Sequence, residues 1–123
     1  MANEITLSIA MQRQHVTVTA DTHMFPAVRK QVTQTGTGQD DRKHSIGTSE
    51  ESITFTDIAT NGYCLMQNID ATNYVEWGFA TGVYGGRMKA GEIAGPFRLN
   101  PGATLYLKAN TAACKIRVIH YED

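Results

Sequence analysis

Short alternating segments separated by turn residues are the feature that most constrains the fold. In residues 114–121, one predicted face carries Cys114, Ile116, Val118 and His120, and the other carries Lys115, Arg117, Ile119 and Tyr121. Residues 5–12 alternate in the same way. A period of two is typical of a strand with one buried face. Such segments recur roughly every 8 to 12 residues, with no amphipathic stretch of helical length. The sequence therefore predicts an all-β fold, a single-domain antiparallel β-sandwich that is jelly-roll-like.

Further strands are predicted in the N-terminal part. Residues 15–20 alternate again, and residues 28–35 form a third strand after a break at Pro26. Proline lacks the backbone donor that a sheet ladder uses, so Pro96 is expected outside the centre of a sheet.

The middle of the chain predicts a hairpin. Residues 63–66 are apolar without alternation, which is typical of a strand buried on both faces. Turn-forming residues fill positions 68–73, and residues 74–77 are predicted to return as the partner strand. Farther on, Pro101-Gly102 favours a type II turn before a strand that begins near Leu105.

Length and charge limit the possible functions. A chain of 123 residues fits one domain spanning residues 1–123. Its 11 basic and 12 acidic residues give a net charge of −1, which disfavours binding to nucleic acid because phosphate contacts need clustered Lys and Arg. The sequence shows neither the basic and apolar leader of a secreted protein nor an apolar run of ~20 residues. We therefore expect synthesis in the cytoplasm and no membrane partner.

A polar segment at about residues 35–51 is predicted to be a long exposed loop. Loops of this length are uncommon in compact domains and tend to carry function. In a protein that assembles, such a loop is a natural contact element. The candidate assembly contacts are Gln39, Asp40, Asp41, Arg42, Lys43 and His44.

Chemistry-bearing residues do not gather in a recognisable pattern. The four histidines are scattered, and His120 alternates with Val118 and Ile116, so a core or interface histidine is favoured over a metal ligand. No nucleophile, phosphate-loop or dinucleotide motif is present. We therefore expect no catalytic residue, metal or cofactor, and a protein that is not an enzyme.

The two cysteines, Cys64 and Cys114, lie in strand-like segments among apolar neighbours. Buried free thiols are favoured because a cytoplasmic origin keeps thiols reduced, and a disulfide between them is the alternative. Among the aromatic residues, Tyr84 in a glycine-rich segment is the candidate ligand-facing side chain, because exposed aromatics on a β-sandwich can stack on sugar rings. Packing in the core or an interface is the competing role.

Several motifs in residues 68–123 resemble a family of small tailed-phage virion structural proteins of the β-sandwich type. The matching segments are residues 68–75, residues 89–92, Pro101-Gly102, residues 109–113 and the acidic end at residues 121–123. These residues mainly form turns, so the resemblance implies a fold more directly than an activity.

The resemblance implies a component of the virion, made in the host bacterial cytoplasm. The expected function is that of a capsid decoration (cement) protein, a homo-oligomer guessed to be a trimer, whose partner is the major capsid protein or another virion protein. The alternative is a tail- or fibre-associated module that recognises a host glycan or another tail protein.

Overall fold

The computed structural model describes residues 3–13 and 23–123, and all regular structure within them is β-strand. The strands are β1 (Asn3–Arg13), β2 (His23–Gln34), β3 (Gln39–Ile46), β4 (Glu51–Ile53), β5 (Tyr63–Asn68), β6 (Val75–Gly78), β7 (Gly86–Met88), β8 (Ile93–Arg98), β9 (Leu105–Ala109) and β10 (Cys114–Tyr121). The strand predicted at residues 15–20 lies outside the described residues. In the described part, no helix is long and apolar enough to cross a membrane.

The chain divides into two compact units, residues 1–34 and 35–123. The sandwich occupies only the second unit, residues 35–123, and not the whole of residues 1–123 as predicted. The all-β, antiparallel character of the fold is confirmed in both units.

The first unit is an antiparallel hairpin of β1 and β2. Its register runs from Asn3 opposite Gln34 to Arg13 opposite His23, with a shift between Ile9 and Met11. Between these rungs β2 has two residues, Pro26 and Ala27, where β1 has one, which is a β-bulge. The break predicted at Pro26 is wrong, because a bulge leaves a residue unpaired and so accommodates a proline that cannot donate to the ladder.

The second unit is a jelly roll, and nested pairing generates it. β6 pairs with β7, β5 with β8, β4 with β9 and β3 with β10, so the chain doubles back on itself about the connection between β6 and β7. Two further pairings, β10 with β5 and β6 with β9, roll this long hairpin into two sheets. Their strand orders are β3-β10-β5-β8 and β4-β9-β6-β7.

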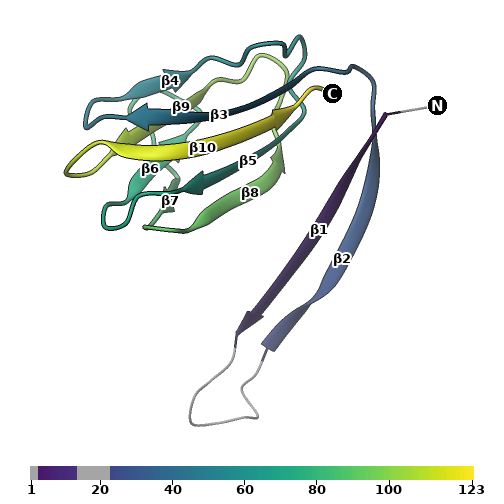
Figure 1. The fold of residues 1–123 in the computed structure, drawn as a ribbon, viewed down its shortest axis with the longest axis horizontal. Helices are drawn as coiled ribbons and strands as arrows, with labels where there is room; N and C mark the ends of the chain where they lie inside the picture. Colours follow the sequence, from purple (N-terminus) through teal and green to yellow (C-terminus); the bar gives the residue numbers. More distant parts are fainter. Residues whose placement is uncertain (1–2, 14–22) are drawn as a thin grey trace. The chain divides into compact units, whose positions relative to one another are not determined.

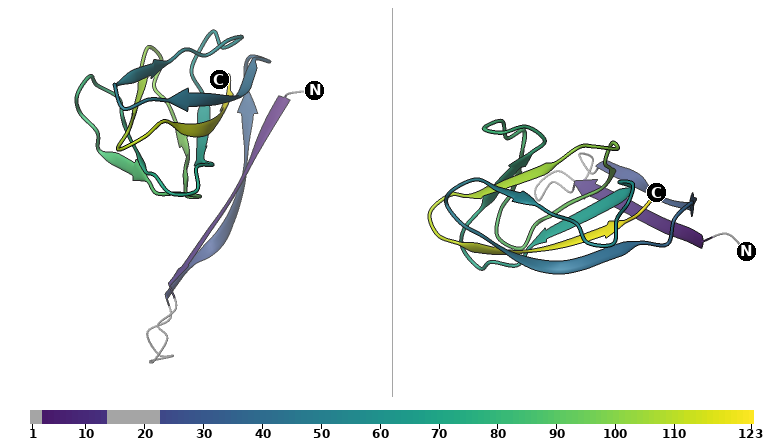
Figure 2. Two further views of the ribbon diagram at one scale, coloured as in Figure 1. Left: turned by 60° about the vertical axis from the view of Figure 1, so that its left-hand side comes forward. Right: turned by 90° about the horizontal axis from the view of Figure 1, so that it is seen from above.

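The two sheets enclose the core between them. Figure 1 shows β3, β10, β5 and β8 side by side, and Figure 2 shows the two sheets as separate layers. Alternate residues of β10, namely Cys114, Ile116, Val118 and His120, face inward and are buried, as the sequence predicts. The remaining core residues come from both sheets: Ile46, Ile53, Cys64, Met66, Val75, Met88, Ala94, Leu105, Leu107 and Ala109.

The hairpin predicted for residues 63–77 is wrong. β5 and β6 lie in different sheets, and the turn between them crosses from one sheet to the other. The buried Asn68 organises this crossing, since its side-chain amide donates to the carbonyl oxygens of Asn73 (2.9 Å) and Met88 (3.1 Å). β5 also alternates, with Cys64, Met66 and Asn68 buried, rather than being buried on both faces.

Other turn and edge predictions are confirmed. Gly102 has a φ of 78°, and the Ala103 amide donates to the Asn100 carbonyl at 3.0 Å, which closes the turn predicted at Pro101-Gly102. Pro96 lies in β8, the outer strand of its sheet, where a missing donor removes no ladder bond to a further strand.

The thiols of Cys64 and Cys114 are free and buried, as predicted. Burial raises the pKa of the Cys64 thiol to about 12. We therefore expect neither thiol to react with Ellman's reagent in the native protein at pH 8, and both to react after denaturation in guanidinium chloride. Rapid reaction of either thiol before denaturation would contradict the packing described here.

Candidate functional site

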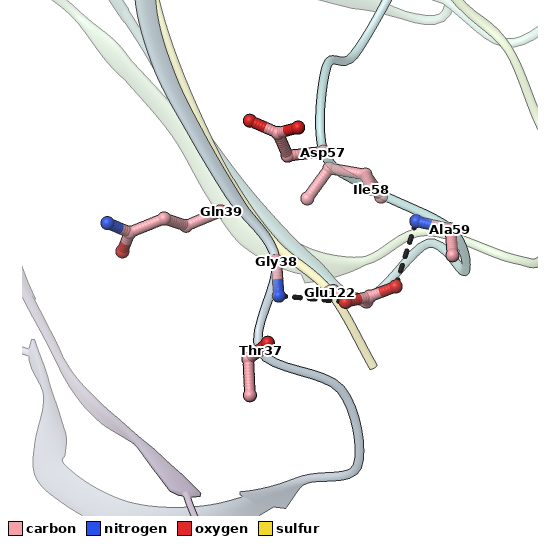
Figure 3. Close-up of a pocket in the computed structure, with 7 residues that line it drawn as sticks. All are labelled: Thr37, Gly38, Gln39, Asp57, Ile58, Ala59 and Glu122. Carbon is pink, nitrogen blue, oxygen red and sulfur yellow. Dashed lines mark hydrogen bonds between the residues drawn. The ribbon is translucent and has the colours of Figure 1, made fainter.

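An open pocket lies where the segment before β3 meets the connection between β4 and β5 and the C-terminal residues. It is lined by Thr37, Gly38, Gln39, Asp57, Ile58, Ala59 and Glu122. Figure 3 shows Glu122 reaching between the two segments, with Asp57 directed away from it. The Glu122 carboxylate accepts hydrogen bonds from the Gly38 amide (2.8 Å) and the Ala59 amide (2.9 Å).

These bonds make Glu122 a structural group. The amides of Gly38 and Ala59 hold the pKa of Glu122 below its usual range, so the carboxylate stays ionised at neutral pH. Backbone bonds hold the same region, because the Glu122 amide donates to Gly38 and the Asp123 amide to Thr60. The acidic end of the chain is thus bound to two other segments.

The close approach of Gly38 to Asp57 shapes this pocket. Asp57 has a φ of 59°, in the left-handed region, which aspartate tolerates better than most residues. A Cβ on Gly38 would lie 1.8 Å from the Asp57 carbonyl oxygen. Only glycine fits at this position without moving the backbone.

The candidate assembly contacts Gln39 to His44 lie in β3 and not in a loop, so the predicted loop at residues 35–51 is wrong in its middle. β3 pairs along its length with β10. Its inward side carries Asp40 and the half-buried His44 as well as Ile46. Polar residues at inward positions removed the apolar alternation that would have revealed the strand.

Asp40 is buried, and its partners explain how a carboxylate is accommodated there. Arg42 donates to both of its oxygens, with Nε to Oδ1 at 2.8 Å and Nη2 to Oδ2 at 3.0 Å. The Thr56 amide donates to Oδ2 at 2.7 Å, and Arg42 also donates to the Thr54 carbonyl. Burial would raise the pKa of Asp40, but the bonds from Arg42 and Thr56 outweigh it and lower the pKa.

The other side of β3 faces solvent and carries Gln39, Asp41 and Lys43. Asp41 accepts two hydrogen bonds from Arg117 of β10, at 3.0 and 2.7 Å. The pair lowers the pKa of Asp41, and both side chains are close to half exposed. Gln39, Asp41 and Lys43 therefore lie on one accessible face. Asp40 is buried, and together with Arg42, whose side chain is 46% exposed, it links β3 to residues 54–56.

A groove continues this surface across the sheet. We call it the outer groove, and it is lined by Leu65, Met66, Gln67, Ile93, Arg117 and Ile119. Leu65 and Ile119 are directly opposite each other on β5 and β10, and Ile93 of β8 is 60% exposed. The surface thus has apolar residues at its centre and the Asp41–Arg117 pair at its border.

Tyr84 is half-buried, and its hydroxyl donates a hydrogen bond to Glu50. Glu50 also accepts from the Gly82 amide at 2.7 Å. The bond to Glu50 raises the pKa of Tyr84 to about 12. The Tyr84 hydroxyl therefore ties the loop between β6 and β7 to the residue preceding β4, and it already has an intramolecular acceptor.

His120 lies in the core, as predicted. Its Nε2 accepts from the Gly62 amide at 3.1 Å, and the Phe55 ring packs edge-on at 4.1 Å. Across the described residues 3–13 and 23–123, no three His, Cys, Asp or Glu side chains gather as metal ligands.

Sequence reasoning missed the pocket at Glu122 and the outer groove. The groove could have been noticed from Leu65 and Ile119, which occupy the solvent-facing positions of their strands. Comparisons with protein-family models, curated proteins and solved structures find no significant match to this chain. The proposal for its function therefore rests on its own surfaces and motifs.

Replacing Gly38 with alanine should lower the free energy of unfolding by about 1 to 3 kcal/mol, because the added Cβ would overlap the Asp57 carbonyl. Gly85→Ala is the matched control, since a Cβ there meets nothing within 4 Å. Urea denaturation followed by the fluorescence of Trp77 measures both. Equal stability of the two variants would contradict the close approach.

Stability should fall as the pH drops from 7.5 to 5.5. Burial lowers the pKa of His120 and of His44 below 6.5, so the unfolded chain takes up protons in this range before the folded chain does. The unfolding free energy of His120→Gln should fall less steeply with pH than that of the wild type. The same measurement on His44→Gln gives the contribution of His44 to the pH dependence. The prediction fails if His120→Gln keeps the full wild-type slope.

Proposed function

We propose that this chain is a phage virion structural protein, a capsid decoration (cement) protein that binds the major capsid lattice and stabilises the head. The observation that carries the proposal is the outer groove with its charged border on the exposed face of one sheet. The motifs in residues 68–123 that resemble small virion proteins support the same function.

The composition of this face suits contact with another protein. Interfaces combine an apolar centre with a polar border, and arginine is enriched in them. Ile93, Leu65 and Ile119 supply the apolar centre, while Arg117, Asp41 and Lys43 supply the border. Ion pairs at such a border contribute mainly to the rate and specificity of association.

The rigidity of the face favours binding without rearrangement. Arg117 is fixed by its two bonds to Asp41, and Leu65 and Ile119 lie on paired strands. Preorganised side chains lose less conformational entropy when they bind. A weak contact of this kind, repeated by a homo-oligomer on a symmetric lattice, gives strong attachment through multivalency.

Binding to decoration-free heads tests the proposal. Ile93→Asp should weaken co-sedimentation of the purified protein with heads by about tenfold or more, because a charge would enter the apolar centre of the contact. Ile69→Asp is the matched control, since Ile69 is also exposed (40%) but lies outside the groove.

The proposal fails if the wild-type protein does not sediment with heads at any accessible concentration. Binding to isolated tails but not to heads would support the alternative of a tail-associated protein. Equal losses for Ile93→Asp and Ile69→Asp would remove the outer groove from the contact.

A further inference from the structure

Basic side chains adjoin the outer groove on the exposed side of the sheet β3-β10-β5-β8. Residues directly opposite each other on paired strands point to the same side of a sheet. One such row crosses all four strands and consists of Lys43, Arg117, Gln67 and Ile93. Lys115 is exposed on the same side of β10, two residues before Arg117. Three basic side chains thus stand beside the apolar centre of the groove.

The acidic groups of this face do not balance the basic ones. Within these four strands, which the structure describes in full, Asp41 is the only acidic residue on the exposed side. Its carboxylate binds Arg117 through both oxygens. Asp70 and Glu92 lie in turns near this end of the sheet, but their carboxylates accept hydrogen bonds from backbone amides of those same turns.

The charges of Lys43 and Lys115 are therefore in excess. Neither side chain forms an ion pair with any residue that the structure describes. Arg117 also keeps binding capacity, because a guanidinium has five N–H donors and Asp41 occupies only Nε and Nη2. The Arg117 side chain is 44% exposed, so a second carboxylate could reach its remaining donors.

We infer that the outer groove binds an acidic segment of the partner protein, with one apolar side chain in the groove and carboxylates on the neighbouring basic groups. The inference deepens the proposed function, on which it rests, by naming the chemistry of the lattice segment. Ile119, Arg117 and Lys115 occupy every second position of β10, about 7 Å apart. The partner's carboxylates should therefore lie about 7 to 14 Å from its apolar side chain.

The size and charge of the site select this partner over others. The groove has a volume of about 80 Å³, far below the roughly 300 to 1,000 Å³ of small-molecule pockets, so it suits a single side chain. Complementary charge at the border of an interface favours an acidic partner and repels a basic one. A nucleic acid fits less well, because Leu65, Ile93 and Ile119 make the centre of the surface apolar.

Titration of the isotope-labelled full chain with a synthetic peptide, followed by NMR, tests the inference. The peptide has one leucine and two glutamates at the second and fourth positions after it, separated by glycines. The amide signals of Leu65, Ile93 and Arg117 should shift, with a Kd in the millimolar range. Peptides with glutamine for glutamate, or with alanine for leucine, should each bind at least about fivefold more weakly.

Charge reversal identifies the basic groups that bind the peptide. Lys43→Glu and Lys115→Glu should each weaken binding by about three- to tenfold, because repulsion replaces attraction. Lys108→Glu is the matched control, since it changes the net charge equally but lies on β9 in the other sheet. The dispersion of the amide spectrum shows that each variant remains folded.

Four results would overturn the inference. One is the absence of shifts at about 5 mM peptide, and another is equal binding of the glutamate and glutamine peptides. The third is an equal loss of binding in Lys108→Glu and in the two variants of the groove border. The fourth is tighter binding of a single-stranded DNA oligonucleotide at the same residues, which would assign the surface to nucleic acid.

Co-sedimentation with decoration-free heads, at about 50 and 500 mM NaCl, distinguishes the two proposals, because salt screens exposed charges. If binding to heads is unchanged by salt and by Lys43→Glu and Lys115→Glu, the proposed function stands and the inference fails. If the acidic peptide binds as expected but heads do not, the inference stands and the proposed function fails.

Discussion

The jelly roll depends on the pairing of β10 with both β3 and β5. β10 lies inside its sheet, and its alternate residues Cys114, Ile116, Val118 and His120 supply much of the buried surface of that layer. Without it β3 would have no neighbour and β5 would have only β8. The two sheets that the nested pairs form therefore enclose a complete core only when β10 is in place.

Buried polar groups specify this arrangement more narrowly than apolar burial does. Asp40 binds Arg42 and Thr56, Asn68 binds the carbonyls of Asn73 and Met88, and His120 accepts from Gly62. Each link joins segments that a hydrophobic pattern alone would leave unconnected. Removing one partner would leave a buried group unsatisfied, which destabilises more than the net contribution of the bond itself.

The sequence predicts the strands whose inward positions are apolar. β10 and β9 follow the expected alternation, and the turn at Gly102 follows from proline and glycine chemistry. β3 was missed because Asp40 and His44 occupy inward positions, and their compatibility with burial depends on Arg42, Thr56 and the rest of the fold. Which strands pair was also beyond local reasoning: the strand predicted at residues 74–77 is present as β6 (Val75–Gly78), but its neighbours are β7 and β9. The outer groove and the Glu122 pocket join segments far apart in the chain, so no local motif marks them.

Nested pairing also has a kinetic consequence. Gln39 of β3 pairs with Tyr121 of β10, so the outermost rung joins residues separated by most of the second unit. Folds dominated by such distant contacts fold slowly, because loop closure must precede the stabilising pairs. During synthesis on the ribosome, β3 and β5 emerge long before β10 and present open edges to other nascent chains. Charged side chains on an edge strand disfavour such edge-to-edge pairing. β3 carries three of them in a row, Asp41, Arg42 and Lys43. They would therefore reduce aggregation of the nascent chain before β10 is synthesised.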